Sequence, residues 1–166
     1  MIVLGIDPGT RITGYGCVRL VERSVEPVLV EAGVLSFKRG SSIESRLAEL
    51  HAALAELIAE LRPNHIAVEK LYAHYKHPRT AILMGHARGV ILLAAEQAGL
   101  TIHHLPSTEV KKSITGHGHA SKRQMQLAVQ SQCRLAEPPS PPDVADAIAI
   151  ALTAARRLAY EQLPIR

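Results

Sequence analysis

The apolar positions along this chain follow two patterns, short continuous runs and longer segments with helical spacing. Residues 2–7 form a short run rich in β-branched side chains that ends before Pro8, which predicts a buried strand. Residues 13–21 and 27–37 carry further β-branched and apolar positions, separated by turn residues. The pattern therefore predicts three strands that form an antiparallel meander at the start of the chain.

The clearest helical spacing lies in residues 43–62. One face of this segment is apolar and consists of Ile43, Leu47, Leu50, Leu54, Leu57, Ile58 and Leu61. Ser41 and Glu44 have the spacing of a capping box that begins a helix, and Pro63 ends it. We therefore expect one amphipathic helix directly after the meander.

The rest of the chain alternates between short apolar runs and longer helical segments. The runs predict strands at 65–69 and 100–105, and the longer segments predict helices at 78–98, 121–133 and 142–160. This order indicates an α/β fold with a five-stranded mixed sheet and helices packed on it. Apolar positions in 78–98 spread beyond one stripe, so one face of that helix is expected to pack against another subunit.

The composition is that of an ordinary globular protein, and a length of 166 residues fits a single domain over residues 1–166. Cys17 and Cys133 match no metal-binding spacing. No apolar run approaches the ~20 residues of a membrane span, and no basic region of a signal peptide precedes the first strand. These features predict reduced thiols, a cytoplasmic location and no membrane partner. The net charge of +4 is only a weak indication of a polyanionic partner.

Four acids stand in apolar surroundings without an obvious charged neighbour. Asp7 ends one predicted strand, Glu69 ends another, and Asp143 and Asp146 lie in the last helix. An ionised carboxylate in an apolar setting costs several kcal/mol unless it is paired or binds a cation. These acids are therefore candidates for catalysis or metal binding.

The predicted elements bring these acids together. Asp143 and Asp146 are three residues apart and share one face of a helix. If the strands that end in Asp7 and Glu69 are neighbours, both acids emerge at the same edge of the sheet. Mg²⁺ or Mn²⁺ suits a set of carboxylates, and two ions about 4 Å apart can activate a water for attack on a phosphodiester and stabilise its leaving oxygen.

Each acid also has a structural explanation. Asp143 has the spacing of a capping box with Ser140. Glu69 is explained equally by a solvated strand end, and Asp7 by a turn that follows its strand. Asp146 has the weakest structural explanation, because it lies in mid-helix among alanines and isoleucines.

A basic segment, predicted as a loop, precedes the helix at 121–133. It contains no acid, and its charged residues are Lys111, Lys112, Lys122 and Arg123. Gly116 and Gly118 allow backbone N–H groups to approach phosphates closely, while the cations neutralise their charge. A solvated basic surface explains the same composition. His117 and His119 have no third ligand in register, so a zinc site is not favoured.

Four motifs stand in order along essentially the whole chain. They are IDPGTRITGYG at 6–16, AVEKLY at 67–72, VKKSITGHGHASKRQM at 110–125 and DVADAIAIA at 143–151. In this combination the chain resembles the RuvC-type Holliday junction resolvases, which are crossover junction endodeoxyribonucleases.

The resemblance implies an RNase H-like fold with helices on both faces of the sheet and a homodimer. It also implies nicking of two opposed strands of a four-way DNA junction in recombination and repair, with two Mg²⁺ or Mn²⁺ ions per active site. A complex with a branch-migration helicase is implied as well. By motif, Asp7, Glu69, Asp143 and Asp146 fall on the family's catalytic acids.

The resemblance also implies DNA contacts. Lys111 and Lys122 match basic residues near the scissile phosphate, and each is a candidate to stabilise the transition state. Tyr72, three residues after Glu69, falls where the family has an aromatic residue, and its ring is expected to stack on a base. The expected DNA-binding residues are Tyr72, Lys76, Arg79, Lys111, Lys112, His117, Lys122 and Arg123.

Three other functions remain open from the sequence. Gly9, Gly14 and Gly16 follow Asp7 as in the sugar-kinase, actin and heat-shock ATPases, but that fold needs two such domains and about twice this length. A non-catalytic, dimeric DNA-binding module would use the same basic face. A YqgF-type nuclease shares the fold but should lack the DVADAIA ending.

Overall fold

One mixed sheet with helices on both faces makes up the computed structural model, which describes residues 1–162 except 10, 23, 39 and 72–77. The described elements are β1 (Ile2–Asp7), β2 (Ile12–Arg19), β3 (Val28–Ser36), α1 (Ile43–Leu61), β4 (His65–Glu69), α2 (Pro78–Gln97), β5 (Thr101–Leu105), α3 (Ser107–Thr115), α4 (Lys122–Cys133) and α5 (Pro142–Glu161). The predicted five-stranded α/β fold is confirmed.

The strand order is β3-β2-β1-β4-β5, with β1 in the centre. β1 pairs antiparallel with β2 and parallel with β4, and β4 pairs parallel with β5. β2 and β3 are antiparallel, so the predicted meander is confirmed. Because β1 and β4 are parallel neighbours, Asp7 and Glu69 end at the same edge of the sheet.

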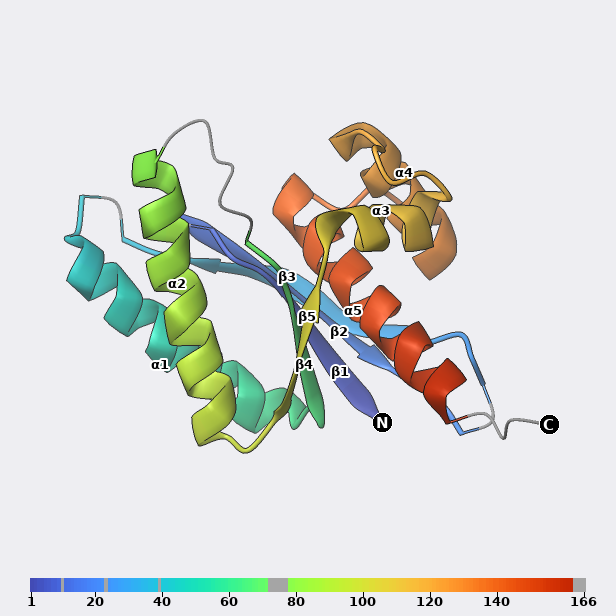
Figure 1. Ribbon diagram of the computed structural model, residues 1–166, viewed down its shortest axis with the longest axis horizontal. Coiled ribbons are helices and arrows are strands. Elements are labelled where there is room, and N and C mark those ends of the chain that lie inside the picture. Colours follow the sequence, from blue (N-terminus) through green and yellow to red (C-terminus); the bar gives the residue numbers. More distant parts are fainter. Residues whose placement is uncertain (10, 23, 39, 72–77, 163–166) are drawn as a thin grey trace.

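Side chains that alternate along the strands form two cores. Leu4 and Ile6 of β1 pack under α1 and α2, while Val3 faces α5 on the other side of the sheet. Figure 1 shows α1 and α2 together on one face, and α5 with α3 and α4 on the opposite face. Helices on both faces are therefore confirmed.

Glycines allow α5 to lie unusually close to the central strands. A Cβ on Gly5 would meet the backbone oxygen of Ala147, and a Cβ on Gly16 would lie 2.7 Å from the Cα of Ile148. Gly14, which pairs with Asp7 in the β1–β2 ladder, would place a Cβ against the backbone oxygen of Asp143. Gly14 and Gly16 lie within β2, so their role is close packing and they do not form a phosphate-binding turn.

The prediction of a loop from Lys111 to Arg123 was partly wrong, because a helix, α3, covers Ser107–Thr115. Val110 and Ile114, four residues apart, are both buried and anchor this helix. Gly116 ends it in the left-handed conformation, with its N–H bonded to the carbonyl of Lys112. Lys111 and Lys112 therefore lie on a helix, and the connecting loop runs only from Gly116 to the start of α4.

Both predicted capping boxes were wrong. The side chain of Ser42 caps α1 by accepting a hydrogen bond from the N–H of Ser45, so the cap lies one residue after Ser41. At α5, Pro141 occupies the N-cap position and makes no side-chain hydrogen bond, which leaves no role for Ser140 as a cap. Asp143 is therefore not explained by a capping box.

Within the described ranges, no helix is long and apolar enough to cross a membrane. Cys17 is buried, Cys133 is partly buried, and both are free thiols.

Candidate active site

The four acids converge on one edge of the sheet, on the side that α5 covers. Asp7 is the last residue of β1 and Glu69 is the last residue of β4. The residues just before them, Ile6 and Val68, pack against α1 and α2. Because side chains alternate along a strand, the two acids point to the opposite face of the sheet. Asp143 lies in the first turn of α5, whose backbone packs on Gly14, the ladder partner of Asp7. The fold thus brings acids from three distant parts of the chain to one place.

Burial and mutual repulsion perturb these acids. Loss of solvent, followed by the charges of Asp146, Glu69 and Asp143, raises the pKa of Asp7 from 3.8 to about 8. The pKa of Asp146 is also raised, first by burial and then by Asp143. The charges of Asp146 and Asp143 thus act on neighbouring acids of the cluster, and bound positive charge would relieve this repulsion.

The pKa of Glu69 is raised by burial and by the charge of Asp146. A hydrogen bond with the Ser107 side chain, at the start of α3, acts in the opposite direction, as does the charge of Lys111. Sequence reasoning missed Ser107 because it missed α3. Its place directly after Pro106, where a helix can begin, was the available signal.

Two lysines supply part of the positive charge that the acids require. Lys122 lowers the pKa of Asp7 and of Asp146, and Lys111 lowers the pKa of Glu69 and of Asp146. Lys122 begins α4 and is exposed, while Lys111 on α3 is half-buried. Both therefore lie beside the acids on the helices that flank α5.

The chemistry of this cluster fits hard divalent cations. The donors are carboxylate oxygens, which Mg²⁺ and Mn²⁺ prefer, and the cations would offset the burial and the repulsion that raise the pKa of Asp7. Within the described residues, no three His, Cys, Asp or Glu side chains are already grouped tightly enough to hold a metal ion. Electrostatic coupling reaches further than a metal–oxygen bond, so the acids face one site without forming a closed ligand cage.

Arg88 was not predicted, yet it fixes the end of the strand that carries Glu69. Its Nε donates to the backbone oxygen of Glu69 at 3.2 Å, and its Nη2 lies 2.7 Å from Nδ1 of His104 on β5. An arginine that acts on a backbone carbonyl leaves no pattern in the sequence. Arg88 therefore ties α2 to the ends of β4 and β5 at the acid cluster.

Some of the expected DNA contacts can be placed and others cannot. Lys112, His117 and Arg123 are exposed on the side of α3 and α4, and Arg79 is exposed at the start of α2. The rings of His117 and His119 lie 5.9 Å apart, edge to face. Tyr72 and Lys76 lie outside the described residues.

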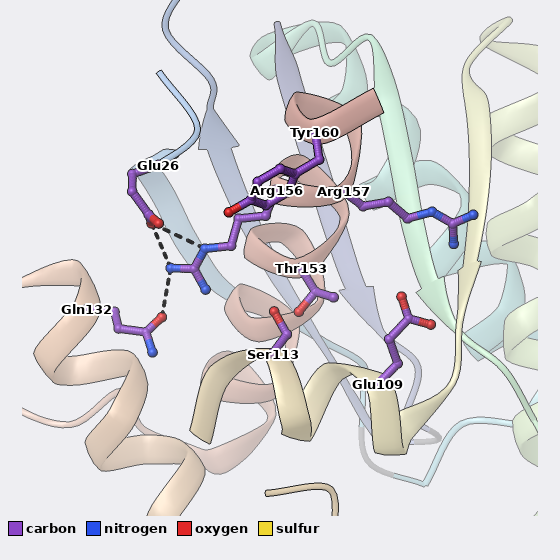
Figure 2. A pocket seen from close by; sticks show the side chains of 8 residues that line it. All are labelled: Glu26, Glu109, Ser113, Gln132, Thr153, Arg156, Arg157 and Tyr160. Carbon is purple, nitrogen blue, oxygen red and sulfur yellow. Dashed lines mark hydrogen bonds and ion pairs between the residues drawn. The ribbon is translucent and has the colours of Figure 1, made fainter. Parts of the chain in front are cut away.

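A separate hollow of about 510 Å³ lies along the later turns of α5 (Figure 2). Arg156 closes one side of it by donating to Glu26 at 2.9 Å and to Gln132 at 3.0 Å. The hollow joins residues of α3, α4, α5 and the segment before β3, and its described lining includes none of the four acids. This hollow is therefore not part of the candidate active site.

Comparison with known proteins identifies the family of this chain. The family model described as crossover junction endodeoxyribonuclease RuvC matches residues 3–154. The chain belongs to the RuvC family. RuvC of Rhodopirellula baltica is 49% identical over 150 residues, covering 90% of this chain and 83% of that protein. RuvC of Pelotomaculum thermopropionicum is 41% identical and covers 98% of this chain and 97% of that protein.

Solved RuvC structures have the same fold. Thermus thermophilus RuvC in complex with Holliday junction substrate has a TM-score of 0.87 at 34% identity, covering 97% of this chain and 96% of that chain. The yeast mitochondrial Holliday junction resolvase Ydc2 has a TM-score of 0.67 at 17% identity, covering 95% of this chain and 80% of that chain, which shows a shared fold. The RNase H-like fold expected of a RuvC protein is therefore confirmed.

Proposed function

We propose that this protein resolves four-way DNA junctions by paired, metal-dependent nicks during recombination and repair. The observation that carries the proposal is the convergence of Asp7, Glu69 and Asp146 with Asp143 at one sheet edge of a RuvC-family chain. In this proposal residues 1–166 act as one nuclease domain in the cytoplasm.

Each part of the site has a chemical role in this proposal. The four acids hold two Mg²⁺ or Mn²⁺ ions, which supply Lewis-acid assistance and charge neutralisation when bound. Lys111 and Lys122 face the same edge and offset the negative charge that develops on the phosphate. Arg88 and Ser107 hold Glu69 in place from opposite faces of the sheet.

The DNA contacts extend outward from these acids. Lys112, His117 and Arg123 bind phosphates from α3, α4 and the loop between them, and Arg79 does so from the start of α2. Tyr72 stacks on a base beside Glu69, and Lys76 adds a cation in the same segment.

The active form is proposed to be a homodimer that pairs through α2. Ile82, Gly85, Gly89 and Leu93 are exposed, and Ile82 and Leu93 are eleven residues apart, or about three helical turns, so they share one face. Open space surrounds both glycines, which would let a second helix approach closely. A two-fold axis at this face pairs two active sites, as two nicks require. A branch-migration helicase is the proposed partner of this dimer.

Incubation of the purified protein with a labelled mobile four-way junction tests the proposal. Symmetrical nicks that require Mg²⁺ or Mn²⁺ would support it. Tight junction binding without cleavage would instead identify a DNA-binding module, and hydrolysis of ATP would identify the kinase-like alternative.

Lys122→Ala is expected to weaken binding to every DNA tested by a similar factor. If Lys122 neutralises one phosphate, the slope of log affinity against log salt concentration should fall by about one. Binding is measured in EDTA over a salt series. Arg134→Ala at the other end of α4 is the control and should keep the wild-type slope. Reduced cleavage with an unchanged salt slope would indicate instead that Lys122 stabilises the transition state.

Arg88→Ala is expected to lower the cleavage rate by about tenfold, because hydrogen bonds that involve a charged group contribute roughly 1.5–3 kcal/mol. A positioning role predicts that more metal is needed for half-maximal cleavage, while junction affinity in EDTA stays the same. Arg88→Lys should recover only part of the rate, because lysine has a single nitrogen in place of the guanidinium nitrogens that contact both Glu69 and His104. Arg157→Ala, which removes an exposed pair with Glu161, is the control. Wild-type metal dependence in Arg88→Ala would refute the positioning role.

A further inference from the structure

A basic groove lies at the acid-bearing edge of the sheet, on the side opposite to Lys111 and Lys122. It has a volume of about 880 Å³ and lies between the β1–β2 turn, the β3–α1 turn and the first turns of α1. Its charged lining residues are Arg11, Lys38 and Arg46. No acid stands among its described lining residues, and the nearby Glu49 carboxylate accepts a hydrogen bond from the N–H of Lys38.

Hydrogen bonds hold the walls of this groove together. The N–H of Phe37 donates to the backbone oxygen of Arg11 at 3.3 Å, which joins the β1–β2 turn to the end of β3. The side chain of Ser41 donates to the backbone oxygen of Lys38 at 2.7 Å, and the N–H of Lys38 donates to Glu49 at 3.1 Å. Arg11 and Lys38 are exposed and stand on these fixed turns. The groove is therefore built by the fold, and Arg11 and Lys38 face solvent in it.

The β3–α1 turn leaves room for a ligand to approach its backbone. Gly40 has a φ of +79°, a conformation that side-chain-bearing residues rarely adopt. A Cβ built on Gly40 would have no atom within 4 Å, so the turn faces open space. Exposed backbone beside two cations suits a phosphate group, which accepts hydrogen bonds as well as charge.

The groove lies close to the acids along the chain and along the sheet. Arg11 is four residues after Asp7, and Ile12, which starts β2, pairs with Ser36 at the end of β3. Phe37 packs in the core under α1 and α2, which places the groove on that face. Figure 1 shows the starts of α1 and α2 on one side of the molecule, away from the N-terminus, where β1 begins. Cations therefore flank the acid-bearing edge on both faces.

We propose that this groove binds the phosphodiester backbone of the DNA arm that leaves the cleavage site. This inference rests on the proposed junction-cleaving function. An arm that emerges at the acids carries one charge per ~1.7 Å of helix axis, and it continues past the edge of the protein in one direction or the other. The exposed cations Arg11 and Lys38 stand on two separate turns, which matches an extended polyanion better than a single small anion.

The test compares charge reversals at the two ends of one strand. Arg11→Glu lies just before β2 in the groove, and Arg19→Glu ends β2 at the opposite edge, where Arg19 pairs with Ile2. Both variants change the net charge equally. Affinity for a four-way junction is measured in EDTA over a salt series, with Lys38→Glu as a second groove variant. Thermal unfolding checks that each variant folds.

The groove predicts about a tenfold or larger rise in Kd for Arg11→Glu and for Lys38→Glu, with a salt slope lowered by one or more. Arg19→Glu should change Kd by less than about twofold. Shortening the DNA arms of the junction should weaken binding by the wild-type protein and should weaken binding by Arg11→Glu much less. Inorganic phosphate at millimolar concentration should not compete. If either charge reversal fails to fold, the neutral double variant Arg11→Gln with Lys38→Gln is used, with a rise in Kd expected.

Equal effects of Arg11→Glu and Arg19→Glu would overturn the proposal, because they would reflect net charge alone. Competition by phosphate at low concentration would also overturn it and would identify a small-anion site. The proposed function fails separately, if the wild-type protein neither binds nor nicks the junction. If the wild-type protein cleaves the junction and the groove variants bind it with unchanged affinity, the groove does not bind DNA, while the proposed nuclease function is unaffected.

Discussion

Asp7→Asn is expected to lower the rate of junction cleavage by at least about 10³-fold, which corresponds to about 4 kcal/mol of lost transition-state stabilisation. The substitution keeps the shape of the side chain and removes a charge from the most perturbed acid of the cluster. Cleavage is measured with saturating protein and Mg²⁺ or Mn²⁺. Junction affinity in EDTA should stay the same at neutral pH, where Asp7 holds its proton, and should rise above about pH 8, where the substitution removes a negative charge that repels phosphate.

The same variant is expected to be more stable than the wild type in EDTA above neutral pH. The pKa of Asp7 is raised from 3.8 to about 8 in the folded protein, so the folded state holds this proton more tightly than the unfolded state. Wild-type stability therefore falls as the pH rises from about 4 to about 8, and asparagine escapes this loss. The gain should be absent below pH 4 and complete above pH 8.

A melting curve at each pH measures this gain. A stabilisation of only 1 kcal/mol would raise Tm by about 2–4 °C in a chain of this size. Glu56→Gln on the exposed side of α1 removes an equal charge and should change neither cleavage nor the pH dependence of Tm. If Asp7→Asn cleaves within about threefold of the wild type, Asp7 is not a primary ligand.

The convergence of the acids could be predicted because it depends on simple rules. A strand that ends in an acid presents that acid at a sheet edge, and parallel neighbours share the edge. Asp7 and Glu69 satisfied this condition once β1 and β4 proved to be parallel neighbours. Asp143 and Asp146 followed from helical spacing alone.

Other parts of the site could not be predicted from local patterns. α3 is only nine residues long and contains several β-branched residues, so its helical propensity is weak and the burial of Val110 and Ile114 stabilises it. Arg88 acts on a backbone carbonyl of another element, which no sequence motif encodes. The groove at Arg11 and Lys38 arises only when two turns meet across the sheet edge.

The role of the glycines in β1 and β2 was the hardest feature to predict from the sequence. Gly14 and Gly16 follow Asp7 closely and have the look of a phosphate-binding turn when the sequence is considered alone. Their function became clear only with α5 in place, because the space they leave is filled by the backbone of that helix. The alanines of α5 have the same explanation, since larger side chains would hold the helix away from the sheet.

Gly5→Ala is expected to destabilise the protein by about 3 kcal/mol or more, and to lower Tm by about 6–12 °C. The added Cβ would meet the backbone oxygen of Ala147 and would lie 2.5 Å from the backbone nitrogen of Ala151. Neither atom belongs to a flexible side chain, so relief requires a shift of α5 or of the central strand β1. Thermal unfolding followed by circular dichroism measures the loss.

Two further variants separate backbone contact from side-chain crowding. Gly118→Ala places a Cβ 3.4 Å from the oxygen of Thr108, an ordinary contact, and should leave Tm nearly unchanged. Combining Gly5→Ala with Ala151→Gly removes the side-chain contact at 2.8 Å but keeps both backbone contacts, so it should recover little stability. Full recovery of stability in the double variant would mean that the Ala151 side chain, and not the backbone of α5, sets the distance between α5 and β1. A wild-type Tm in Gly5→Ala would show that α5 tolerates a larger separation from β1, and the close packing of helix on strand would then not be what holds Asp143 and Asp146 at the edge of the sheet.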